Sequence, residues 1–191
     1  MDYATGLLNG DAKIEGLSID QDRRWQLIVL LNRHLYGDYE ELVANELLRD
    51  KSERARNFAI SAEAVRPQAE VKREWLDNIV ARRDRYKLSQ IKAATGALFP
   101  PEQLALYQAA SARLFGAVRT VSATGDTLHN KAYAMLFPVV CSKPDISMYS
   151  GTLDQHPELM PALERVLKNR RQQSQRCAAM AQLQKKNNSA G

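Results

Sequence analysis

Residues 71–79 read VKREWLDNI and place Val71, Trp75 and Ile79 at intervals of four residues. Side chains four residues apart lie on one face of an α-helix, so the stretch predicts an amphipathic helix with one apolar side. Pro67 lies just before it, and proline suits the first turn of a helix but disfavours helical geometry in the preceding residue. The sequence therefore predicts two successive helices, one ending at Arg66 and the next beginning at Pro67.

Helix signals of the same kind occur along the whole chain. Asp20 and Ser52 are of the types that cap helix N-termini, whereas Gly37, Pro100 and Pro138 are of types that end or interrupt helices. No segment of strand length alternates apolar and polar residues. The sequence predicts helices over residues 20–37, 38–50, 52–66, 67–79, 87–96, 100–114, 126–137, 148–155 and 157–183.

The predicted helices are joined by connections of a few residues, so sequence neighbours are expected to pack antiparallel. Stacked pairs of this kind form an all-α, HEAT-like α-solenoid. This interpretation rests on the rhythm of helices and turns, because no residue-level repeat motif occurs. We expect a single helical domain over residues 1–183 and a disordered tail over residues 184–191, which begins QKKNN.

The composition indicates a folded chain without a membrane segment. Hydrophobic residues make up 45% and charged residues 26%, values typical of soluble globular proteins. No apolar run, Leu27–Leu31 included, approaches the roughly 20 residues that span a bilayer. The first residues, Met1–Ala4, lack the pattern of a signal peptide. We therefore expect a cytoplasmic protein. In a fragment, however, a missing signal peptide says nothing about where the parent protein is located.

No residue pattern predicts catalysis or metal binding. The zinc-hydrolase signature HExxH is absent, because His34, His129 and His156 are isolated along the chain. Nucleophile-elbow, Walker and dinucleotide-binding motifs are absent as well. Cys141 and Cys177 are few and far apart, so we expect two unpaired thiols in a reducing compartment. The sequence thus predicts no catalytic, cofactor-binding or metal-ligating residue.

The formal net charge of +5 is concentrated near the end of the chain. Residues 158–191 hold seven Lys and Arg residues but only two acids. Such a basic helix suits phosphate, an acidic membrane or an acidic protein surface, but a solvated helix face is the favoured interpretation. Trp25 and Trp75 fall in phase with aliphatic positions, which favours core packing over base stacking. We expect no nucleic-acid partner.

Several short motifs, in order, resemble a known family. The run Leu17–Leu27 (LSIDQDRRWQL) places Arg-Trp after acidic residues, and Glu46–Ser52 reads ELLRDKS. They are followed by Ala64–Pro67 with Lys72 and Trp75, by Phe99–Gln103 (FPPEQ), and by Leu136–Pro138 (LFP). Over about residues 6–183 this series resembles the C-terminal helical domain of zinc-dependent aminopeptidases of the aminopeptidase N family, the endoplasmic-reticulum aminopeptidases included. Gly125 and Asn130 depart from the pattern of that family.

The resemblance implies that this chain is one domain of a larger metallo-aminopeptidase. It would limit access to the active-site chamber and contact the peptide substrate, while an upstream domain binds zinc and hydrolyses the peptide. The implied partners are that upstream catalytic domain and the peptide. An exposed apolar helix face would also favour self-association. The alternative is a free-standing helical-repeat module that binds another protein.

Arg66 is the one candidate for peptide contact. The sequence places it in a turn at a helix end, and its planar guanidinium is suited to a peptide carboxylate. The competing interpretation is that Arg66 satisfies free carbonyl groups at the end of its own helix.

Overall fold

The computed structural model describes residues 1–81 and 85–188 of the chain. Regular structure in these ranges is helical, with one isolated bridge between Ile14 and Leu17. None of the described helices combines the length and apolarity needed to cross a membrane. The chain divides into two compact units, Met1–Ala110 and Ser111–Gly191, and the division falls within one helix. The single domain expected over residues 1–183 therefore stays a prediction.

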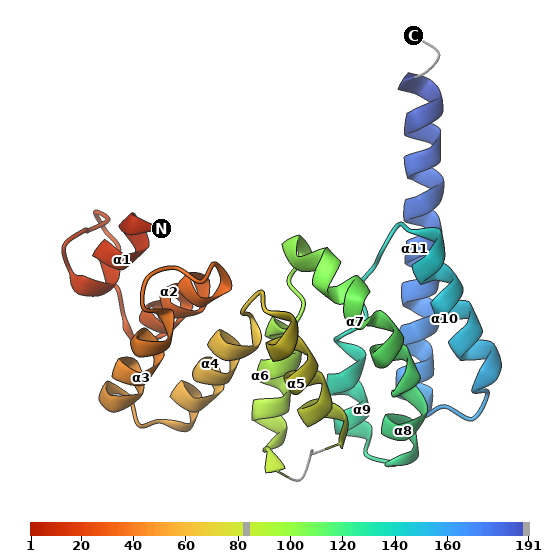
Figure 1. The fold of residues 1–191 in the computed structure, drawn as a ribbon, viewed down its shortest axis with the longest axis horizontal. Coiled ribbons are helices and arrows are strands. Elements are labelled where there is room, and N and C mark those ends of the chain that lie inside the picture. Colours follow the sequence, from red (N-terminus) through yellow and green to blue (C-terminus); the bar gives the residue numbers. More distant parts are fainter. Residues whose placement is uncertain (82–84, 189–191) are drawn as a thin grey trace. The chain divides into compact units, whose positions relative to one another are not determined.

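Unit 1 is built from successive helices, each of which packs on its neighbours (Figure 1). Helix α4 contacts both α2 and α6, while α3 contacts α2 and α4, and α5 contacts α4 and α6. Helix α1 packs on α2. Helices α2 and α4 thus each contact both the next helix along the chain and the next but one. The bounds are α1 Asp2–Asn9, α2 Gln21–Arg33, α3 Tyr39–Arg49, α4 Glu53–Ala64, α5 Ala69–Ala81, α6 Leu88–Ala97, the short 3₁₀ turn η2 Pro101–Gln103, and the first part of α7 Leu104–Gly116.

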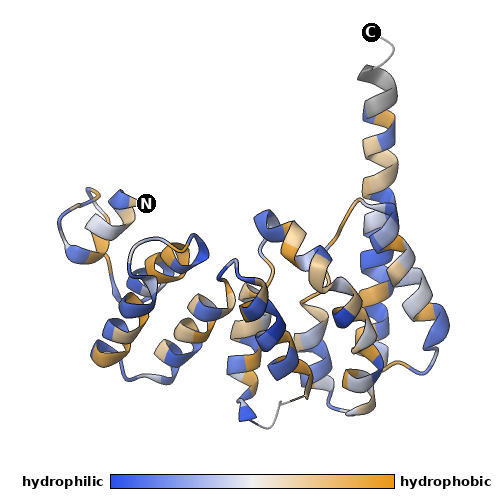
Figure 2. Ribbon diagram, viewed as in Figure 1, coloured by the Kyte–Doolittle hydropathy of each residue, from blue (hydrophilic) through white to orange (hydrophobic). Residues whose placement is uncertain are grey.

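The core of unit 1 joins α2 to α4 through one large and several small side chains. Trp25 is 1% exposed and its ring stacks on Phe58, with centroids 6.1 Å apart. Ala55 and Ala62 on α4 are fully buried, and such small residues let two helix backbones approach closely. Figure 2 shows hydrophobic and hydrophilic residues on each of helices α2 to α6, as the amphipathic patterns predict.

The predicted helix starts at Asp20 and Ser52 are confirmed, whereas the helix predicted from Pro67 begins at Ala69 and the helix end predicted at Gly37 is wrong. The side chains of Asp20 and Ser52 accept hydrogen bonds from the backbone of the first helical turn, at Arg23 and Ala55. Helix α2, expected to reach Gly37, ends at Arg33. The reason is that Leu35 takes a left-handed conformation, with φ 49°, and Tyr36 N donates to Leu31 O. This closure is normally made by glycine, so the sequence gives no warning of it.

Unit 2 packs its helices around a cluster of aromatic rings. The rings of Phe115, Tyr133, Phe137 and Tyr149 form pairs with centroids between 4.9 and 6.2 Å apart, mostly edge to face. Helix α11 contacts both α9 and α10. The bounds are the second part of α7, α8 Val118–Ala123, α9 Thr127–Ala134, α10 Lys143–Gln155 and α11 Pro161–Asn188.

Some helix bounds in unit 2 differ from those expected. Helix α9 ends at Ala134, three residues before Phe137. Helix α10 begins at Lys143, well before Met148, because Ser142 caps it. Two short helices, α1 and α8, were not predicted, since short helices depend on their neighbours more than on local pattern. Helix α11 starts at Pro161 and continues through residues 184–188, within the range of the expected tail, while 189–191 lie outside the described residues.

The expectation of two unpaired thiols is wrong. Cys141 and Cys177 form a disulfide, with Cα atoms 5.1 Å apart, although 36 residues separate them in sequence. Cys141 lies in the segment before α10, and Cys177 lies on α11. The fold brings that segment against α11, a contact that spacing along the chain does not reveal.

Candidate functional site

Helix α2 carries apolar side chains beyond the face that is buried in the core. Trp25, Ile28 and Leu31 are buried. Leu30 lies outside this buried face, and Val29 lies at its border, partly buried against the core. Together they line two hollows in the surface of unit 1. An apolar run such as residues 27–31, which reaches more than one side of a helix, is usually covered by neighbours on each of those sides. The exposed side of α2 around Leu30, with the two hollows beside it, is therefore the candidate binding surface of unit 1.

The first hollow lies between α2, α1 and the loop that joins them. Its volume is about 520 Å³, and its wall includes Leu7, Ile14, Leu17 and Leu30. Ile14, Leu17 and Leu30 are 40%, 38% and 36% exposed, unusually open for large apolar side chains that lie together. The hollow therefore offers a contact surface for an apolar group.

The second hollow adjoins the first across α2. Its volume is about 420 Å³, and it shares Gln26, Val29 and Arg33 with the first. Small residues of α6, including Ala93 and Gly96, form much of its remaining wall. We call the two hollows together the α2 groove. Their combined lining is mainly apolar, as in most sites that bind organic ligands or peptide side chains.

Cationic side chains lie at the edges of the α2 groove. Arg33 makes a two-pronged ion pair with Glu102, and this hydrogen bonding lowers the pKa of the Glu102 carboxyl. Arg23 donates to Ser18 O over 2.7 Å. Lys92 of α6 lines the second hollow. The described lining contains no acid, histidine or cysteine. The groove is thus arranged for binding rather than for acid–base chemistry.

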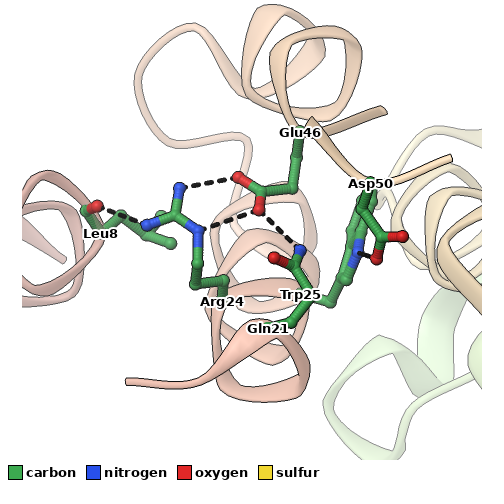
Figure 3. Close-up of polar contacts among 6 residues, drawn as sticks. All are labelled: Leu8, Gln21, Arg24, Trp25, Glu46 and Asp50. Carbon is green, nitrogen blue, oxygen red and sulfur yellow. Dashed lines mark hydrogen bonds and ion pairs between the residues drawn. The ribbon is translucent and has the colours of Figure 1, made fainter. Parts of the chain in front are cut away.

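A polar network fixes α2 in the position that opens the groove. Arg24 contacts Glu46 with two nitrogens and donates to Leu8 O over 2.7 Å (Figure 3). Gln21 Nε2 also donates to Glu46, and Trp25 Nε1 donates to Asp50 over 3.1 Å. Two segments of the family resemblance, residues 17–27 and 46–52, therefore meet in this network. Arg24, Trp25 and Glu46 hold α1, α2 and α3 together, whereas Leu17, Arg23 and Gln26 of the first segment line the groove.

Arg66 lies where the sequence predicts, in the turn between α4 and Pro67. Its Nε donates to Asn32 Oδ1 and its Nη1 to Glu40 Oε1, each over 2.9 Å. Its guanidinium also lies over the ring of Tyr39, 5.0 Å from the centroid. The side chain is only 12% exposed, so a peptide carboxylate would compete with Glu40, which is 71% exposed. Contact between Arg66 and a peptide stays a prediction.

The described residues do not fit a zinc site. No group of three or more His, Cys, Asp or Glu side chains in the described ranges could hold a metal ion. His34 and His156 lie at the ends of α2 and α10, and His129 is buried in the first turn of α9. We therefore derive no chemistry from zinc within this chain.

Sequence reasoning missed the α2 groove, although one signal of it was present. Residues 27–31 read LIVLL, so apolar side chains point from α2 in every direction. One buried face accounts for only part of such a run. The contribution of the loop residues Ile14 and Leu17 could not be foreseen, because nothing in their pattern predicts which helix they approach.

Comparison with known proteins finds a partial similarity to an aminopeptidase. No family model matches the chain. The chain is similar to a protein described as aminopeptidase N from Streptomyces lividans, with 28% identity over 158 residues. The match covers 81% of this chain but only 17% of that protein, so the chain spans about a sixth of that relative. The similarity suggests a part of an aminopeptidase and is consistent with one domain of a larger protein.

Proposed function

We propose that this chain is the C-terminal helical domain of a zinc-dependent aminopeptidase of the aminopeptidase N type. It limits access to the active-site chamber and contacts the peptide, while domains upstream bind zinc and release the N-terminal residue. The observation that carries the proposal is the similarity to an aminopeptidase N over 81% of this chain but 17% of the relative. In unit 1, α2 contacts α4 and α4 contacts α6, so alternate helices stack on one another. Such stacking is what a HEAT-like α-solenoid requires, and solenoids offer long binding surfaces.

The α2 groove supplies the peptide-contact surface in this proposal. Its apolar walls suit the side chains of a peptide, and Lys92 suits a carboxylate. Arg66 is a second candidate for a carboxylate, if Glu40 gives way to the peptide. Both contacts would be reached only by peptides long enough to extend from the catalytic centre to this domain.

The test is the kinetics of the full-length parent enzyme with substrates of two lengths. Leu30→Gln and Arg66→Ala are expected to raise KM for peptides of about ten residues severalfold. Aminoacyl chromogenic substrates, which end at the first residue, are expected to keep their KM and kcat. Leu48→Gln is the matched control, because Leu48 is 70% exposed on α3 and does not line the groove. Equal effects on both substrate lengths would contradict peptide contact.

A free-standing protein-interaction module is the alternative, and the exposed apolar groove suits it as well. The sequence of the parent gene distinguishes these two functions. The aminopeptidase proposal requires an HExxH motif upstream of this domain in the same reading frame. The cytoplasmic location expected from the sequence stays a prediction. The disulfide argues against a cytoplasmic location, since such bonds persist mainly outside reducing compartments.

A further inference from the structure

Residues 138–142, the second part of the connection from α9 to α10, are attached to the rest of unit 2 at three points. Tyr149 Oη of α10 donates to Pro138 O over 2.7 Å. Val140 N donates to Ser174 Oγ of α11 over 3.1 Å, and Cys141 is bonded to Cys177 of the same helix. Ser174 and Cys177 are three residues apart and so lie on one face of α11. Two of the three attachments are therefore made to a single turn of α11.

This turn is also where α11 stops being covered by the rest of unit 2. Leu163, Leu167 and Ser174 are fully buried, whereas Met180 and Leu183 are 59% and 55% exposed. Figure 1 shows the C-terminal part of α11 continuing well past the N-terminal end of α10. The disulfide thus lies at the border between the packed and the projecting parts of the helix.

We propose that the disulfide between Cys141 and Cys177 is redox-sensitive and sets how much of α11 is held against the rest of unit 2. We call this disulfide the clasp. The proposal goes beyond the proposed aminopeptidase function and does not rest on it. Cys141 is exposed and Cys177 is half-buried, so a small thiol reaches the sulfur of Cys141 first. Access from solvent distinguishes this pair from disulfides enclosed in a core.

The chemistry is thiol–disulfide exchange with a small thiol such as glutathione. A thiolate attacks Cys141 Sγ, the bond between the two cysteine sulfurs breaks, and the Cys177 thiolate leaves and takes a proton from water. A second thiolate then attacks the sulfur of the bound small molecule. Cys141 leaves as a thiol, and the two small thiols become one disulfide. The protein gains two electrons and two protons, and the reverse sequence closes the clasp with oxidised glutathione.

Opening the clasp removes the covalent attachment and leaves the bond between Val140 and Ser174. The projecting turns of α11 then have little support, because short helical segments without packing are marginal in water. Closing a loop of 36 residues favours the attached state by roughly several hundredfold in the chain-entropy model. We expect amide hydrogens of residues 138–142 and of α11 from Cys177 onward to exchange on the order of a hundredfold faster after reduction.

The test compares hydrogen exchange of the 191-residue chain in oxidised and in reduced glutathione, with free thiols counted in the unfolded protein. We expect no free thiol after oxidation, two after reduction, and faster exchange confined to the two regions named. Cys141→Ser with Cys177→Ser is the control that removes redox sensitivity, and its exchange should be fast in both buffers. Ser174→Ala removes the neighbouring hydrogen bond only, so its exchange should still respond to reduction.

Two outcomes would overturn the proposal. One is two free thiols after treatment with oxidised glutathione, since the clasp would then not form. The other is formation of the disulfide with no change in exchange on reduction, since the bond would then not control α11. The Cys141→Ser and Cys177→Ser variant keeps the second outcome decisive, because serine is close to cysteine in size and the helix ends are unaltered.

Discussion

Arg24 and Glu46 form a two-pronged ion pair between α2 and α3, with Nε 2.8 Å from Oε1 and Nη2 2.7 Å from Oε2. The side chains are 17% and 3% exposed, so solvent screens the pair only weakly. Arg24 Nη1 also donates to the carbonyl of Leu8 at the end of α1. One guanidinium thus joins three helices, and the family-like Arg-Trp motif has a structural role.

Glu46→Ala is expected to lower the free energy of unfolding by about 3 kcal/mol, because it leaves a largely buried guanidinium without its carboxylate. Urea unfolding at pH 7, followed by circular dichroism, measures the change. The control is Glu41→Ala on the same helix, which removes an exposed carboxylate and should change the free energy by less than about 0.5 kcal/mol. Equal losses in the two variants would show that the ion pair contributes little.

The same pair predicts sensitivity to acid. Hydrogen bonding to Arg24 lowers the pKa of Glu46, so this carboxyl stabilises the fold above its unfolded pKa of about 4.3. That contribution is lost as the pH falls through the lower pKa of the folded state. Glu46→Gln should therefore flatten the fall in unfolding free energy below about pH 4.3. A variant with the slope of the wild type would contradict the assignment.

Lys72 predicts a second rise in stability with pH, at neutral to alkaline pH. Its side chain is 1% exposed, its Nζ donates to Ala64 O over 2.8 Å, and burial lowers its pKa from 10.5 to about 7. Between these two values the unfolded chain binds more protons than the folded one, so this group makes stability rise with pH. The rise is up to roughly 3 kcal/mol from pH 7 to 9.5.

Urea unfolding at both pH values measures this effect. Lys72→Met should abolish the rise, and the exposed Lys51→Met is the control that should retain it. A wild-type chain whose unfolding free energy is flat over this range would mean that the buried amine stays protonated.

Asp126 caps the N-terminus of α9 and is expected to stabilise its first turn. Its side chain accepts hydrogen bonds from Leu128 N over 2.9 Å and from His129 N over 3.0 Å. Asp126→Ala should lower the free energy of unfolding by about 1 kcal/mol, and Asp126→Asn should lower it less. Thermal unfolding checks both, with the exposed Asp154→Ala on α10 as the control. No difference between Asp126→Ala and the control would contradict the capping role.

The α2 groove predicts self-association of the 191-residue chain at high concentration. Ile14, Leu17 and Leu30 expose apolar surface side by side, and such patches associate in water. Leu17→Asp should weaken the association, because a charge in the interface would be desolvated. Leu48→Asp, which lies outside the groove, should leave it unchanged. Light scattering coupled to size exclusion gives the mass, and a wild-type monomer at every concentration would contradict the prediction.

The sequence predicts best where a local pattern alone determines the structure. The four-residue spacing of Val71, Trp75 and Ile79 corresponds to α5, and the caps Asp20 and Ser52 begin α2 and α4 as expected. These signals act within one or two turns, so they do not depend on the rest of the fold.

Features that depend on distant contacts could not be predicted. The left-handed Leu35 ends α2 early, and no residue-type preference announces leucine in that role. The disulfide needs the segment before α10 to lie on α11, and the α2 groove needs a loop to fold back on α2. Arg66 lies where expected, yet its acceptors Asn32 and Glu40 come from residues 34 and 26 positions earlier.

The hydrogen bonds of Asn32 bear on how helices α2, α3 and α4 unfold. This fully buried amide donates to Ile28 O within α2 and to Tyr39 O at the start of α3, while its oxygen accepts from Arg66 after α4. Loss of any one helix would therefore leave a polar group of Asn32 or Arg66 unsatisfied in a water-poor place. Helices α2, α3 and α4 consequently cannot separate one at a time at little cost, as independent repeats would. We expect these three helices to unfold together.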